Sequence, residues 1–143
     1  MSSPSTIPAF KAKLLQLLQA RPNLAGIQVT YGAPLPAPGR EFISLGGTRG
    51  QQSTAALGRF AREEEYRLTV HVSVLREGQD QQSATERVFT LAQELELCVR
   101  ADPSIGNTVR TCLVDGPFEL SEGATDTHRT ALLTLSLLCT ARI

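Results

Sequence analysis

The chain has 143 residues, 41% of them hydrophobic, and its 14 basic and 14 acidic side chains give a formal net charge of zero. This length predicts a single domain over residues 1–143, and the neutral charge argues against a nucleic acid or an anionic membrane as partner, because both reward a basic excess. The apolar runs are too short to span a bilayer, and the first ten residues lack the pattern of a signal peptide.

The first third of the chain predicts one helix and two strands. Ser5 or Thr6 can cap a helix whose apolar residues recur at positions 10, 14, 17 and 18. Pro22 and Gly26 end this helix. The segments GIQVTYG (26–32) and REFISLGG (40–47) indicate short strands, and the stiff, proline-rich connector APLPAPG (33–39) joins them.

Residues 47–62, GTRGQQSTAALGRFAR, show no clear period and predict a long mobile loop. Structureless loops beyond about 12–15 residues are uncommon in compact domains and are usually functional or disordered. Arginine and aromatic side chains are favoured at protein contacts. The candidates for contact with a partner are therefore Arg49, Gln51, Gln52, Arg59, Phe60 and Arg62. A disordered insertion is the alternative.

Residues 63–75, EEEYRLTVHVSVL, alternate between apolar and polar side chains and predict one long strand. Its polar face carries Arg67, Thr69, His71 and Ser73. This face is either a reaction site centred on His71 or a wall against which another protein lies. The three glutamates at its start indicate a solvated strand end or, alternatively, a patch that pairs with arginines of a neighbouring copy.

The second half of the chain predicts a helix followed by two strands. Ser83 and Glu86 fit a capping box, and apolar residues follow at helical spacing until Asp102 and Pro103. Residues 107–116 and 128–143 indicate strands, and residues 117–126 a polar turn region. The predicted order is α-β-β-loop-β-α-β-β, an α+β fold with a mostly antiparallel mixed sheet and two helices on one face.

The residues usually found in reaction centres are sparse. The two histidines, His71 and His128, have no set of metal-ligand residues at suitable spacing, and the chain contains no G-x-S-x-G nucleophile motif. The glycines at 46–50 match neither a P-loop nor a dinucleotide fingerprint. We therefore expect no catalytic, metal-binding or cofactor-binding residues. Cys98, Cys112 and Cys139 each lie on an apolar repeat and indicate reduced core thiols in a cytosolic protein.

The charges cancel overall but are unevenly placed. Residues 40–62 hold four arginines and one acid, whereas residues 77–102 hold six acids and two arginines, and residues 115–126 hold four acids and no base. Unlike patches of this kind suit contacts between neighbouring copies. Scatter over a solvated surface is the alternative.

The order of elements also resembles that of a known family. A leucine-bearing first helix (FKAKLL, 10–15) precedes two strands and a long loop, and the strand EYRLTVHVSV (65–74) leads into the helix ATERVFTLAQELE (84–96). This organisation, over residues 7–143, resembles the tail terminator proteins of long-tailed bacteriophages, and more broadly their tail-completion and head–tail joining proteins.

The resemblance implies a structural virion protein without catalytic residues. Such proteins form a ring of six copies that caps the tail tube, stops its polymerisation and offers a joining surface to the head. The implied partners are further copies of the chain, the tail tube protein and a head-completion or connector protein, with DNA passing through the channel. The implied location is the head-proximal end of the tail, and the host cytoplasm during assembly. Glu63, Glu65, Arg67 and His71 are then expected at a subunit interface or on the channel face.

Three alternatives stay open from the sequence. The chain could be a head-completion or connector adaptor, or a minor tail protein. It could be a non-enzymatic α+β ligand-binding or regulatory module, with a pocket between the sheet and the helices. It could also be a small hydrolase that uses His71 or His128.

Overall fold

The structure is a computed structural model and describes residues 4–33, 40–56 and 61–143. In chain order its elements are α1 (Ile7–Gln19), the short 3-10 helix η1 (Pro22–Leu24), β1 (Gln28–Thr30), β2 (Glu41–Ala56), β3 (Ala61–Glu77), α2 (Gln81–Ala101), β4 (Thr111–Val114), β5 (Glu119–Ala124) and β6 (His128–Arg142). The predicted α+β class is confirmed.

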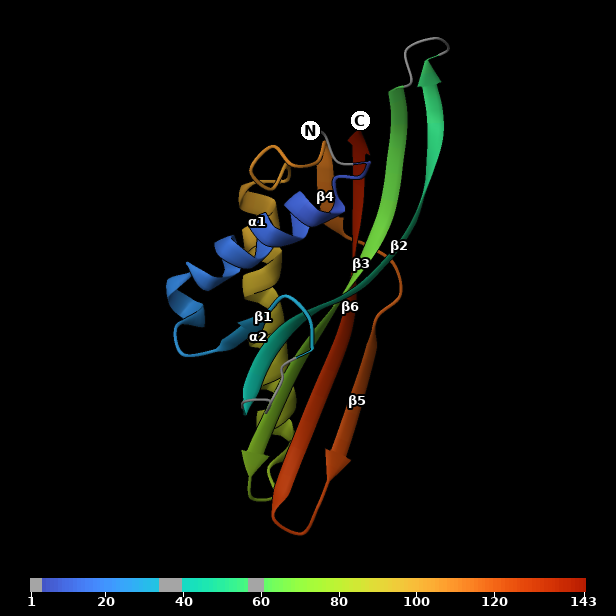
Figure 1. Ribbon diagram of the computed structural model, residues 1–143. Helices are drawn as coiled ribbons and strands as arrows, with labels where there is room; N and C mark the ends of the chain where they lie inside the picture. Colours follow the sequence, from blue (N-terminus) through green and yellow to red (C-terminus); the bar gives the residue numbers. More distant parts are fainter. Residues whose placement is uncertain (1–3, 34–39, 57–60) are drawn as a thin grey trace.

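The strands form one mixed sheet with the order β1-β2-β3-β6-β4, and β5 pairs with β6 further along the same edge as β4 (Figure 1). The pair of β1 and β2 is parallel, and all the other pairs are antiparallel. The three long strands β2, β3 and β6 run through the whole sheet. The end of the β2–β3 hairpin projects beyond β4.

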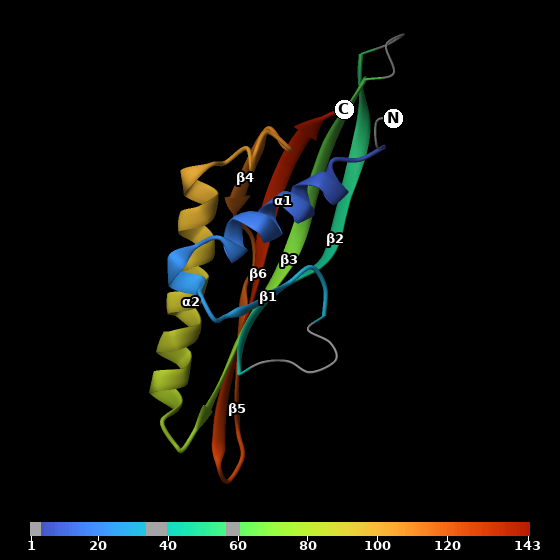
Figure 2. The same cartoon turned by 60° about the vertical axis from the view of Figure 1, so that its left-hand side comes forward.

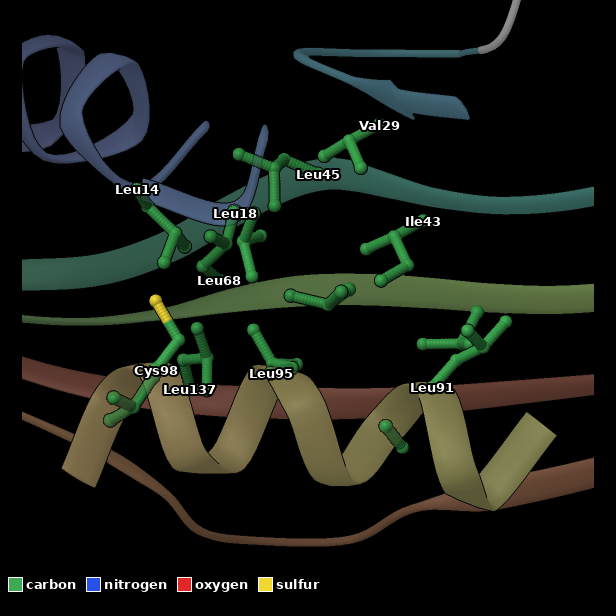
Figure 3. Packing of buried hydrophobic residues seen from close by; sticks show 14 of the residues in the cluster. Leu14, Leu18, Val29, Ile43, Leu45, Leu68, Leu91, Leu95, Cys98 and Leu137 are labelled. Carbon is green, nitrogen blue, oxygen red and sulfur yellow. The ribbon is translucent and has the colours of Figure 1, made fainter. Parts of the chain in front are cut away.

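Both helices cover the same face of the sheet, as predicted (Figure 2). From α1, Phe10, Leu14 and Leu18 are fully buried, and α2 contributes a buried row that includes Leu91 and Leu95. These side chains meet the apolar residues of the long strands (Figure 3). The alternation of β3 is confirmed, because its buried positions are Tyr66, Leu68, Val70, Val72 and Val74.

The two helix starts differ, because the N-cap residue of α1, Thr6, makes no side-chain cap hydrogen bond, whereas that of α2 does. The first helix begins after Thr6, and the Ser5 hydroxyl accepts a hydrogen bond from the Ile7 amide (3.1 Å). The second helix begins earlier than expected, because the Asp80 carboxylate accepts from the Ser83 amide (3.0 Å) and takes the N-cap position. Ser83 is therefore inside the first turn, and the predicted capping box is wrong.

The predicted long loop at 47–62 is also wrong where the structure describes it. Residues 47–56 belong to β2 and residues 61–62 to β3, and the two strands pair from end to end. The glycines at 46, 47 and 50, which suggested a loop, are needed for the geometry of the strands instead. The register gains one residue between Leu45 and Thr48, which is a β-bulge at Gly46 and Gly47. At Gly50 a Cβ atom would lie 2.2 Å from the Glu65 carbonyl oxygen, so only glycine permits the close approach of β2 and β3.

The polar turn region predicted at 117–126 contains a strand instead. Strand β5 runs antiparallel to β6, and Leu120 lies opposite Leu133 and packs against the core. The sequence shows no alternation here, because Leu120 is the only large apolar side chain on the core-facing side of β5 and the exposed Glu122 follows it on that side. Short, charged strands are typical of sheet edges, where they discourage unwanted pairing.

The three cysteines are buried and unbridged, which confirms the prediction of reduced core thiols. Cys112 and Cys139 lie opposite each other on β4 and β6. A hydrogen bond with Cys112, and then burial, raise the pKa of the Cys139 thiol. Burial also raises the pKa of the Cys98 thiol. Such thiols are inert at neutral pH, because the thiolate is the reactive form.

Candidate interaction surface

The sheet face opposite the helices is lined mostly by polar side chains from β2, β3 and β6, with Leu132 and Leu138 among them, and we call it the open face. On β3, every outward position from 63 to 73 is polar or charged, and the paired register of the neighbouring strands places the other members beside them. The open face consists of Arg49, Gln51, Glu63, Glu65, Arg67, Thr69, His71, Ser73, Leu132, Thr134, Ser136, Leu138 and Thr140. The four predicted interface residues, Glu63, Glu65, Arg67 and His71, thus share one surface.

His71 lies in the middle of the open face, with β2 on one side and β6 on the other. Its Nδ1 atom is 3.3 Å from the Thr134 hydroxyl, and a Cβ atom at Gly46 would lie 3.3 Å from its Nε2 atom. A catalytic base needs a nucleophile within reach and a group that orients the ring. The hydrogen-bond partner of this imidazole is a threonine rather than a carboxylate. In the described structure the His71 ring lies between Gly46 and Thr134 within a mostly polar surface.

Replacing His71 with alanine should cost less than about 1 kcal/mol of folding free energy, because the side chain is only half-buried and its one hydrogen bond with the described residues, to Thr134, is long (3.3 Å). Urea unfolding measures this loss, and a Thr69→Ala variant of the same face serves as its control. A loss above about 3 kcal/mol would mean that the imidazole holds the sheet together.

Arg67 fixes the turn that follows β4. Its Nη1 atom donates to the Asp115 carbonyl oxygen (2.7 Å), and its Nη2 atom donates to the Asp115 carboxylate (3.0 Å). Gly116 has a φ of 103°, and a Cβ atom there would lie 2.5 Å from Arg67 Nη1. The turn therefore needs glycine so that the backbone can wrap around the guanidinium. Arg67 is 42% exposed and stays accessible on the open face.

The triple-glutamate segment divides between the two faces of the sheet. The Glu63 carboxylate lies between Arg110 (3.3 Å) and Arg142 (3.7 Å), and Glu65 is exposed on the same face. Glu64 points to the helix side and is only 4% exposed. The arginine partners of Glu63 belong to its own chain, so the prediction of pairing with a neighbour's arginines is not needed to explain this residue.

The residues predicted as a contact loop do not share one surface. Arg49 and Gln51 are exposed on the open face. Gln52 lies on the other face, where its Nε2 atom donates to Glu64 (2.6 Å) and its Oε1 atom accepts from Arg62 (3.1 Å). Gln52 and Arg62 therefore act within the chain. Arg59 and Phe60 lie outside the described residues.

Glu64 is the most important residue that the sequence pattern did not single out. Its carboxylate accepts hydrogen bonds from the Thr6 amide (2.9 Å), the Thr6 hydroxyl (2.6 Å) and Gln52. Burial alone would raise the pKa of this carboxyl, but the hydrogen bonds from Thr6, Ser5 and Gln52 outweigh it and lower the pKa. Glu64 thereby ties the start of α1 to the base of the projecting hairpin. The only sign of this burial in the sequence was that Glu64 lies two positions before the buried Tyr66 on the same strand, so both side chains point to the same side of the sheet.

A second surface lies along α2 and β4, away from the open face. Two hollows of about 200 and 390 Å³ share Glu96 and Val114, and their linings are mostly apolar. Phe118, at the rim, is 67% exposed. The pocket expected for a ligand-binding module needs convergent polar groups. Here Glu96 is instead paired with Arg100 (2.9 Å).

Two further features bear on the class of site. Within residues 4–33, 40–56 and 61–143, no three histidine, cysteine or acidic side chains come close enough together to hold a metal ion. No helix in this part of the chain combines the length and apolarity needed to cross a bilayer.

Comparisons with known proteins identify the fold. No protein-family model matches the sequence, and no curated protein matches it significantly. Among solved structures, the chain is similar to one from the virion of a native gene transfer agent particle, with 14% sequence identity and a TM-score of 0.55. The match covers 97% of this chain and 100% of the other. The chain therefore has a fold that also occurs in a component of a virion.

Proposed function

We propose that this chain is a structural protein of a phage-like virion, and that within the virion it acts as a tail terminator. In this role several copies form a ring on the last ring of the tail tube. The ring stops polymerisation of the tube and presents a new surface to the head. The role requires edges that fit neighbouring copies and requires no reaction centre.

The observation that carries the proposal is the shared fold, because it extends over nearly the whole of both chains. The open face supports the same conclusion. It is a broad, mostly polar surface with the β2–β3 hairpin beside it, and among the described residues the hydrogen-bond partner of the central His71 is Thr134 rather than a carboxylate. A head-completion protein or a minor tail protein would share these features, and the partner that binds distinguishes them.

The mass of the purified protein, measured by light scattering alone and with assembled tail tubes, tests the proposal. We expect a closed ring of about six copies, either in solution or at one end of each tube in electron micrographs. Binding to the portal side of a head, with no effect on tube ends, would favour a head-completion role. A monomer that binds neither tail tubes nor heads would contradict the proposed function.

A further inference from the structure

The two edges of the sheet differ in shape and charge in a way that suits contact between copies. One edge is β2, which β1 covers only at positions 42–44. The other edge is formed by β4 and β5. Among the described residues, the main chain of β2 from 48 to 54 pairs only with β3, and the main chain of β4 only with β6. Unpaired edges of this kind are templates for strand addition.

Arg49 lies on the β2 edge, and its main chain pairs with β3. Its side chain is exposed and charged, and it makes no hydrogen bond or ion pair with any other described residue. Its direct neighbour on β3 is Arg67, another cation. Like charges directly opposite each other destabilise a strand pair. The charge of Arg67 is balanced by Asp115. The charge of Arg49 is not balanced by an ion pair with any described residue.

The β4 edge offers an anion in Asp115, whose Oδ2 atom already accepts from Arg67 of its own chain, so a neighbour's Arg49 would share this carboxylate. No lysine or arginine occurs between 111 and 128, and the same stretch has acids at 115, 119, 122 and 126. Asp115 is 45% exposed and follows directly after β4. Leu113, also on the outward side of β4, is 45% exposed and pairs with Leu138. Strand β4 is therefore followed by the acid Asp115 and preceded by Arg110, which pairs with Glu63 (3.3 Å), so Asp115 is the group that complements Arg49.

Strand direction and height agree with pairing between these edges. Strand β2 runs antiparallel to β3, and β4 runs antiparallel to β6, so β2 and β4 point in opposite directions. Rotation about an axis along the strands preserves direction and height, so β2 of one copy would meet β4 of the next in antiparallel fashion. The register places Gln51, Glu65, Thr140 and Thr111 in one row across the sheet.

We propose that the β2 edge of one copy pairs, over residues 48–51, with β4 (Thr111–Val114) of the next copy, and that Arg49 binds the neighbour's Asp115. This contact rests on the proposed ring and specifies how its subunits join. It is heterologous, because two different edges meet, so its repetition gives a ring where the rotation closes, and not a two-fold dimer.

Disulfide crosslinking tests the pairing of the edges. In a variant with Gln51→Cys and Thr111→Cys, the two new thiols of one copy are separated by three strand spacings, about 14 Å, which is too far for a disulfide. Oxidation should therefore join different copies and give a ladder up to the mass of the ring in denaturing gels. A variant with Gln51→Cys and Ser121→Cys is the matched control, because Ser121 lies eight residues lower along β6 and should give no ladder.

Charge reversal tests the role of Arg49. We expect Arg49→Glu to raise the concentration needed for assembly by about tenfold or more, and Arg49→Lys to leave it within about threefold. The Arg49→Glu monomer should stay folded, because the substitution removes a repulsion with Arg67.

The outcomes separate this contact from the proposed function. If rings form but the Gln51–Thr111 ladder is absent, or if Arg49→Glu assembles like the unmodified chain, the contact is wrong and the ring remains. If the protein stays monomeric both alone and with tail tubes, the proposed function is contradicted. The proposed contact is then contradicted as well, because it requires a ring.

Discussion

Replacing Phe10 with alanine should destabilise the chain by about 3–5 kcal/mol, a large part of the 5–15 kcal/mol that is usual for a domain. Phe10 is fully buried and lies edge-on to Tyr66, with ring centroids 5.8 Å apart and an angle of 64°. The variant loses the apolar contact of the ring, the aromatic pair and the packing around the cavity that remains. Urea unfolding followed by circular dichroism measures the loss.

The matched control is Gln16→Ala, on the exposed side of the same helix, which should change the free energy of unfolding by no more than about 0.5 kcal/mol. The slope of the free energy of unfolding against urea concentration gives a second result. An unchanged slope with a lower midpoint means that the whole domain is weakened, whereas a smaller slope means that α1 has already detached from the sheet. A loss of less than about 1 kcal/mol would contradict the docking of α1 on β3 that the structure shows.

The elements with strong periodicity could be predicted from the sequence. The buried face of β3 and the buried row of α2 follow from residue spacing alone, because each buries one face against a single core. The helices on one face also follow, since two amphipathic helices and a one-sided sheet leave few other arrangements.

The hairpin and β5 could not be predicted, for a physical reason. Both lie at the edges of the sheet, where β2 from 47 to 54 and most of β5 face solvent on both sides. Without a buried face there is no alternation to recognise. The glycines at 46, 47 and 50 added a misleading loop signal, because a bulge and a close strand approach need the same residue type as a turn.

The candidate surface was predicted only in part. The outward positions of β3 follow from its period, so Glu65, Arg67 and His71 were correctly grouped on one face. Their partners depend on segments far apart in the sequence. Arg67 binds Asp115, which is 48 positions away, and Glu64 binds Thr6, which is 58 positions away. Such pairings depend on sheet order and register, which no local pattern contains.

Substituting Glu64 by glutamine should lower the free energy of unfolding at pH 7 by about 2–3 kcal/mol, because hydrogen bonds to a buried charged acceptor are worth more than neutral ones. The carboxylate accepts from two groups of Thr6 and from Gln52, and a glutamine amide would turn a donor toward one of them. The neighbouring Glu65→Gln is the control. The same chemical change on the exposed face should cost no more than about 0.5 kcal/mol.

The loss should also depend on pH with a definite sign. The folded state lowers the pKa of Glu64, so the ionised form is favoured by folding. Its contribution is fully present above about pH 4.3, the ordinary value for glutamate, and is lost as the pH falls through the lower folded-state value. Urea unfolding at pH 7, 5 and 3 should therefore show the difference between the original chain and Glu64→Gln narrowing at pH 3. A difference that is the same at every pH would mean that the charge of Glu64 contributes nothing.

The same variant connects stability with assembly. Glu64 and Gln52 join the start of α1 to the base of the hairpin whose edge carries Arg49. If this base must be rigid for the edge to pair, Glu64→Gln should weaken ring formation even under conditions where the monomer is fully folded, whereas Phe10→Ala should do so only as far as it unfolds the chain. Light scattering at matched folded fractions separates the two effects. Equal ring formation by Glu64→Gln and Glu65→Gln under those conditions would show that the tie between α1 and the hairpin serves stability alone.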